Sequence, residues 1–93
     1  MHLLFDGVPE GIDVREVRAT LLGLSGVQGL HELHVWGMAT SETALTAHLV
    51  VDDPRADRDL LLRLATHLLE GRFKIRHVTL QIEAVNCPSE RRC

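Results

Sequence analysis

The stretch Val27–Val51, VQGLHELHVWGMATSETALTAHLVV, decides the fold because it joins two β-strand patterns through a short polar connection. Val27–Met38 predicts one strand and Thr43–Val51 the next, and so short a connection favours an antiparallel hairpin. Neighbouring side chains in a strand point to opposite faces. In the second strand, one face is formed by Leu45, Ala47, Leu49 and Val51, and the other by Thr46, His48 and Val50. One face of the hairpin is therefore expected to be buried.

Helical patterns lie on both sides of this hairpin. Asp13 is a suitable N-cap, and the apolar residues after it recur at helical spacing until Ser25-Gly26, where the helix is expected to end. A second helix is expected to begin at Asp53-Pro54, an acidic cap followed by proline, and to end at Gly71. Its buried stripe is expected to consist of Leu61, Leu64, Ala65 and Leu68.

A third strand is expected over Phe73–Ala84. Two helices can bury their apolar stripes only by covering one face of the resulting three-stranded sheet. The sequence therefore predicts an α+β fold, a ferredoxin-like two-layer sandwich in αββαβ order with both helices on one face. The other face is expected to carry the polar residues His48, His77, Thr79, Gln81 and Glu83.

The composition excludes several classes of function. A chain of 93 residues has room for one domain, and its net charge of −3 offers no basic surplus for binding nucleic acid. It contains neither an apolar run long enough for a membrane helix nor a signal-peptide pattern, so we expect a reduced, cytoplasmic chain. Gly-rich phosphate loops and a G-x-S-x-G motif are absent, which argues against an enzyme.

Six histidines in a chain with few aromatic residues direct attention to metal binding. His48 and Glu83 are expected to share one sheet face although they come from different strands. A zinc ion held between them is one interpretation, and a cross-sheet ion pair is the other. His34 and His77 also have two interpretations each, as metal ligands or as ordinary surface residues of the sheet.

The orientation of His31 depends on how the first strand is built. In a regular strand, His31 shares a face with Leu33 and Val35, whereas His34 matches His48 better. If the strand begins after residue 31, or contains a β-bulge, His31 turns toward the polar face. The alternation of residues leaves both possibilities open.

Three segments together carry a resemblance to a known family: GVPEGIDVREVRATLLGLSGVQGLHELHVWGM, ALTAHLVVDD and RHVTLQIE. In this order and spacing they resemble the cytoplasmic C-terminal domain of cation diffusion facilitator metal-efflux transporters, in particular the bacterial zinc, cobalt and cadmium branch. The resemblance implies a ferredoxin-like domain over residues 1–84, followed by a tail over residues 85–93. It also implies an excised soluble fragment in which Met1 is an added start.

The resemblance also implies metal ligands, at His31, His48 and Glu83. Arg76 stands where many relatives have a ligating histidine, so His77 beside it is a candidate substitute. Some relatives add thiolates from the tail, and Cys87 is better placed for this role than Cys93. The implied ion is Zn²⁺, with Co²⁺, Cd²⁺ or Ni²⁺ as possible occupants.

The function implied by the resemblance is that of a regulatory, metal-binding and dimerisation domain of a divalent-cation efflux transporter. Its expected partners are a second copy of the chain, divalent metal ions and a transmembrane domain that this sequence does not contain. The expected location is the cytoplasmic side of the membrane. Two alternatives remain, namely a structural dimerisation module without metal and a free-standing small metal chaperone.

Overall fold

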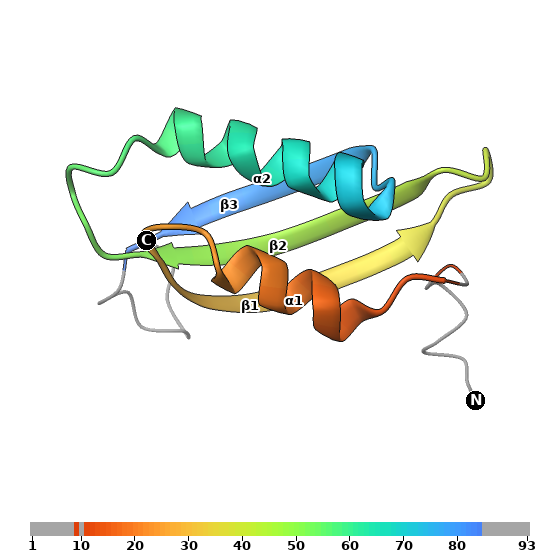
Figure 1. Ribbon diagram of the computed structural model, residues 1–93, viewed down its shortest axis with the longest axis horizontal. Helices are drawn as coiled ribbons and strands as arrows, with labels where there is room; N and C mark the ends of the chain where they lie inside the picture. Colours follow the sequence, from red (N-terminus) through yellow and green to blue (C-terminus); the bar gives the residue numbers. More distant parts are fainter. Residues whose placement is uncertain (1–8, 10, 85–93) are drawn as a thin grey trace.

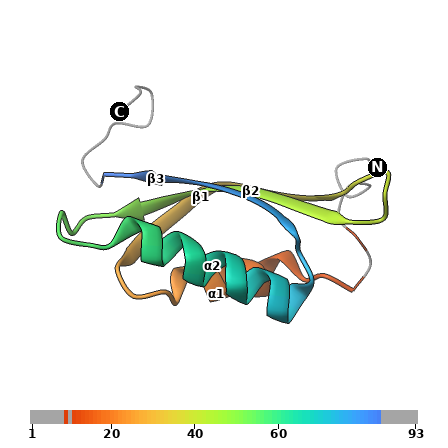
Figure 2. The ribbon, with the colours of Figure 1, turned by 90° about the horizontal axis from the view of Figure 1, so that it is seen from above.

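The computed structural model describes residue 9 and residues 11–84 (Figure 1). Its elements follow the order α1 (Val14–Leu22), β1 (Val27–Gly37), β2 (Thr43–Val51), α2 (Arg58–Phe73) and β3 (His77–Glu83). Both helices cover the same face of the sheet, which Figure 2 shows edge-on. The predicted α+β, ferredoxin-like two-layer sandwich in αββαβ order is confirmed.

The sheet has β2 at its centre, because the strand order is β1-β2-β3. β1 pairs with β2 antiparallel, as the hairpin pattern predicted, and β3 pairs with β2 in parallel. The face of β2 that was expected to be buried is covered by the helices, with Leu45, Ala47, Leu49 and Val51 each at most 1% exposed. The core thus lies between β2 and the helices, and the opposite face of the sheet is left open.

The first helix ends earlier than predicted. Asp13 is its N-cap and accepts a hydrogen bond from the backbone N–H of Arg15 at 2.9 Å. The helix stops at Leu22 with Gly23 as its C-cap, so the predicted end at Ser25-Gly26 is wrong. Gly26 has φ +93° and belongs to the turn before β1. Its left-handed conformation, which glycine adopts without steric cost, redirects the chain into the sheet.

The second helix begins later than predicted. Asp57, not Asp53, is its N-cap and accepts from the backbone N–H of Leu60 at 3.0 Å. Asp53 instead accepts from the N–H of Arg55 at 2.9 Å, within the turn that precedes the helix. A short acidic side chain before proline suits a turn as well as a helix cap, which explains the error.

The C-terminal end of α2 and its buried stripe also differ from the prediction. The helix continues through Gly71 to Phe73, and Lys74 closes it in the left-handed conformation, so β3 begins at His77 rather than Phe73. The buried stripe is Leu61, Ala65 and Leu69, so its prediction at Leu68, which is only partly buried, is wrong. Leu64 is 47% exposed, because the helix presents every fourth residue to the sheet. Neither helix of the described residues combines the length and apolar character that crossing a membrane requires.

Asp57→Ala is expected to lower the free energy of unfolding by about 1 kcal/mol, because the N–H of Leu60 loses its acceptor. Asp53→Ala is the matched control and should cost less than half as much, since it removes only a turn contact. Denaturant unfolding followed by circular dichroism measures both. Equal losses for the two variants would contradict the assignment of the helix start.

Candidate metal centre

A β-bulge in β1 determines where His31 points. His31 pairs with His48 and His34 pairs with Thr46, so β1 advances three residues (34 − 31) while β2 advances two (48 − 46). The extra residue falls at Glu32, which has φ 56° in the left-handed region. Residues directly opposite each other in a sheet share a face, so both histidines of β1 lie on the open face with His48. Of the two possibilities left open by the sequence, the bulge is the one that occurs.

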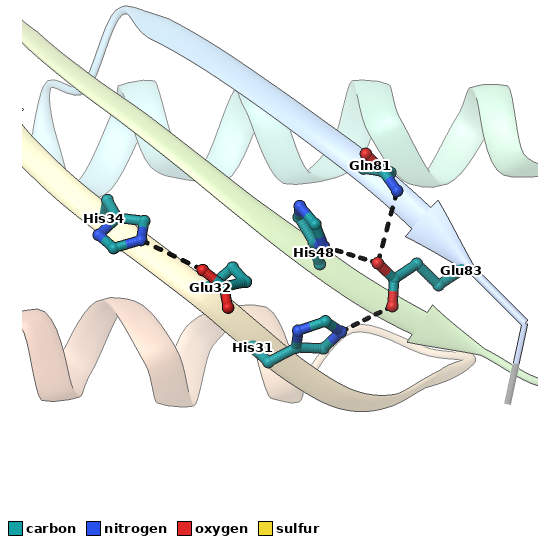
Figure 3. Close-up of polar contacts among 6 residues, drawn as sticks. All are labelled: His31, Glu32, His34, His48, Gln81 and Glu83. Carbon is teal, nitrogen blue, oxygen red and sulfur yellow. Dashed lines mark hydrogen bonds and ion pairs between the residues drawn. The ribbon is translucent and has the colours of Figure 1, made fainter. Parts of the chain in front are cut away.

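The parallel pairing of β3 with β2 brings Glu83 to the same place. Gln81 lies opposite His48 and Glu83 lies opposite Val50, all on the face that the helices leave open. Figure 3 shows the carboxylate of Glu83 reaching back over β2 toward the two imidazoles. Three strands thus contribute one side chain each to a cluster of His31, His48 and Glu83, which we call the His-His-Glu cluster.

The donor atoms of the His-His-Glu cluster lie close together. Nε2 of His31 is 2.6 Å from Oε1 of Glu83, and Nδ1 of His48 is 2.6 Å from Oε2 of the same carboxylate. One ligand atom from each residue lies within 4.8 Å of the other two, and the imidazole rings meet edge-on with their centres 5.0 Å apart. The Glu83 side chain is 15% exposed and the His31 side chain 44%, so the cluster is open to an arriving ion on the His31 side.

The electrostatics of the cluster favour an ionised carboxylate. The hydrogen bond from His31 is the main reason that the pKa of Glu83 lies below its usual range, and His48 lowers it further. Partial burial acts in the opposite direction but is outweighed. Glu83 therefore carries its negative charge at neutral pH, as a ligand of a divalent cation must.

Nδ1 of His48 stands out because it is buried without a hydrogen bond. Its contact with Oε2 of Glu83, at 2.6 Å, is an ion pair without the geometry of a regular hydrogen bond. Buried polar atoms in proteins nearly always have a partner, and in the ion-free chain the partner of this nitrogen is the Glu83 carboxylate. Two imidazole nitrogens and a carboxylate oxygen are a donor set that zinc accepts. Donors around tetrahedral zinc stand about 3.4 Å apart, so small side-chain rotations would suffice to admit an ion.

The structure does not bring every predicted ligand to this cluster. His77 lies at the start of β3, opposite Ala44, and its Nε2 contacts Oε1 of Glu42 in the hairpin connection. It is thus separated from Glu83 by the length of the strand. Nε2 of His34 lies 3.5 Å from Oε1 of Glu32, and His34 is an exposed residue of the open face. Cys87 lies outside the described residues, and so does Cys93.

Sequence reasoning missed the partners of these side chains. Glu42 lies in the short polar connection of the hairpin, for which the sequence suggested no role, yet its carboxylate contacts His77. Gln81 was placed on the open face without a role, yet its Nε2 is 3.4 Å from Oε2 of Glu83. Its position two residues before Glu83 on the same strand was the available signal, because residues i and i+2 share a face.

The Glu42–His77 contact predicts a pH effect. The hydrogen bond from His77 is the main reason that the pKa of Glu42 lies below its usual 4.5, so His77→Ala should raise it toward that value. Because the folded-state pKa is depressed, the pair stabilises the fold above pH about 4.5, and this contribution is lost as the pH falls through the folded-state pKa. Carboxylate NMR titration measures the change. His34→Ala is the control, and an unchanged Glu42 pKa in His77→Ala would contradict the contact.

Comparisons with known proteins agree with this architecture. Residues 9–85 match the family model for "Cation efflux protein, cytoplasmic domain". The chain is 40% identical over 85 residues to the "Cadmium, cobalt and zinc/H(+)-K(+) antiporter" of Bacillus subtilis, which covers 89% of this chain and 27% of that protein. It is 36% identical over 81 residues to the human "Proton-coupled zinc antiporter SLC30A2", covering 87% and 22%. The chain spans about a quarter of the length of these relatives.

A solved structure is similar as well. The "Metal-bound C-terminal domain of the CzcD transporter from Cuprividus metallidurans" superimposes with a TM-score of 0.72 and 33% identity, covering 77% of this chain and 99% of that one. The family model covers most of the chain, and the sequence resemblance is thereby confirmed. The chain belongs to the cation diffusion facilitator family and corresponds to its cytoplasmic domain.

Proposed function

We propose that this chain is the metal-binding, regulatory and dimerisation domain of a divalent-cation efflux transporter, and that the His-His-Glu cluster is its metal site. The observation that carries the proposal is the convergence of His31, His48 and Glu83, from three strands, with their ligand atoms within 4.8 Å of one another. The metal-bound domain of the CzcD transporter, which has the same fold, supports it.

Zinc is the ion that this donor set fits best. Imidazole nitrogen and carboxylate oxygen are ordinary zinc ligands, and tetrahedral zinc needs one donor more than the cluster supplies. Water or the thiolate of Cys87 would complete the shell. Co²⁺, Cd²⁺ and Ni²⁺ accept similar donors, so they are weaker alternatives. Because both imidazoles must be neutral to bind, zinc affinity should fall as the pH drops through the histidine range.

Regulation follows if zinc binds one arrangement of a homodimer better than another. An ion can shift an equilibrium only by its difference in affinity for the two states. A cluster on the open sheet face, near the bulge of an edge strand, is placed where a second copy could approach it. In the complete transporter, the preferred arrangement would bias an attached transmembrane domain toward transport, with this domain on the cytoplasmic side.

A dimerisation module without metal is the second candidate. The contacts of Glu83 with both histidines favour it, because they tie β3 to β1 and β2 with no ion present. The two candidates differ in what the histidines are for. In the first candidate they are ligands, and in the second they only pair with the Glu83 carboxylate.

Zinc titration by calorimetry, combined with sedimentation of the same samples, tests the proposal. We expect about one ion per chain at pH 7.5, weaker binding at pH 5.5, and a dimer whose sedimentation changes on adding zinc. No heat beyond dilution, with the dimer intact, would leave only the structural module. Zinc binding by a chain that stays monomeric at all concentrations would remove the dimerisation part.

A further inference from the structure

We infer that Gln81 is a positioning residue of the zinc site, whose side-chain amide holds the Glu83 carboxylate in place once an ion occupies the cluster. The inference rests on the proposed function and adds to it a residue outside the set of ligands. Gln81 and Glu83 project from the same face of β3, and Gln81 lies directly opposite His48 in the sheet. Nε2 of Gln81 donates to Oε2 of Glu83 at 3.4 Å (Figure 3).

Without an ion, the imidazoles compete with Gln81 for the carboxylate. Oε1 accepts from Nε2 of His31, and Oε2 lies 2.6 Å from Nδ1 of His48. The Gln81 contact is long for a hydrogen bond in this state, and the same oxygen is also in contact with His48. The amide is therefore of secondary importance to Glu83 in the ion-free chain.

Zinc binding makes the Gln81 contact more important to Glu83 than the imidazole contacts. A metal takes the lone pair of the imidazole nitrogen that binds it, so that nitrogen can no longer donate a hydrogen bond. If Nε2 of His31 and Nδ1 of His48 become ligands, both imidazole contacts to Glu83 are replaced by bonds to the ion. Among the side chains of the described residues that contact this carboxylate, Gln81 is then the donor that remains.

A hydrogen bond that survives metal binding gives Gln81 an effect on affinity. An amide does not titrate near neutral pH, so its N–H groups stay available whatever the protonation of the histidines. Bound to one oxygen of Glu83, it restricts rotation of the carboxylate and leaves the other oxygen directed to the ion. Hydrogen-bonding partners of metal ligands commonly change metal affinity 10–100-fold when they are removed. For an exposed amide, we expect the lower end, about tenfold.

Gln81→Met tests the inference, because methionine keeps the length of the side chain but cannot donate. Thr79→Val is the matched control, since it removes a polar group from the same face of β3 one position earlier along that face. Calorimetry should show about tenfold weaker zinc binding for Gln81→Met and unchanged binding for Thr79→Val. The visible absorption of bound Co²⁺ should change in Gln81→Met alone, and ion-free unfolding should be the same for both variants.

The possible failures are distinguishable. Zinc binding by Gln81→Met within twofold of the unsubstituted chain, with the same Co²⁺ spectrum, would overturn the inference and leave the proposed function standing. A loss of affinity matched by an equal loss of ion-free stability would assign Gln81 a structural role and overturn the inference as well. An unsubstituted chain that binds no zinc would remove the proposed function itself, and the role of Gln81 with it.

Discussion

His48→Ala is expected to weaken zinc binding more than about 100-fold, beyond the usual effect of losing a residue that merely orients a ligand. His48 lies on the central strand between the other two members of the cluster, and its buried Nδ1 is 2.6 Å from Oε2 of Glu83. Its removal takes away a ligand and one partly exposed contact with Glu83, so zinc binding should suffer far more than ion-free stability. Calorimetry and denaturant unfolding of the same variant measure the two effects separately.

Glu83→Gln completes the test of the cluster. It keeps the shape of the side chain and removes the negative charge that offsets a divalent ion, so zinc affinity should fall to a similar degree. His67→Ala is the control, because His67 is exposed on α2, on the helix side of the sheet. His77→Ala should also bind zinc normally, since His77 contacts Glu42 instead. Equal zinc binding by His48→Ala and His67→Ala would contradict the metal site.

The sequence was sufficient for the layers of this fold. The apolar alternation of β2 requires one buried face, and two amphipathic helices leave only one way to cover it. The polar face followed from the same alternation, which is why the strand pattern alone could place His48 and Glu83 together. Periodicity is a reliable guide here because each of these residues lies within a regular stretch of strand.

Prediction failed where the chain departs from regularity. Asp53-Pro54 has the composition of a helix start, but it forms a turn, and Asp57 caps the helix four residues later. The assignment of Leu64 to the core failed because leucines occur on several faces of α2 and only the packing against the sheet selects among them. His77 shares a face with Glu83, yet position along the strand separates them, and facial alternation carries no information about that distance.

The bulge at Glu32 is the clearest case. Leu30 and Val35 are both buried in the core although they are five residues apart, which a regular strand cannot achieve. One extra residue resolves the conflict, and it also puts His31 opposite His48. In the bulge, Glu32 and Leu33 both lie opposite Ala47. The spacing of the apolar residues could not say which of the two is the extra residue.

Deletion of Leu33 is therefore expected to be far more damaging than deletion of Glu32. Either deletion removes this bulge and keeps His31 opposite His48, since the pairings on both sides of the bulge already have the correct register. Without Glu32, Leu33 takes the inward position, where it already packs partly against the core. The chain should fold and bind zinc, losing only the exposed Glu32–His34 pair, worth at most about 1 kcal/mol.

Without Leu33, the carboxylate of Glu32 is forced toward the helices at the position opposite Ala47, which is 1% exposed. An unpaired buried charge costs about 3–5 kcal/mol, a large part of the 5–15 kcal/mol that stabilises a typical domain. Most molecules of the variant should be unfolded, and only the remaining folded fraction should bind zinc. Circular dichroism, denaturant unfolding and zinc calorimetry on both deletions decide the matter. If deletion of Glu32 abolished zinc binding, the bulge would be needed for the geometry of the site itself, and the argument from register would be wrong.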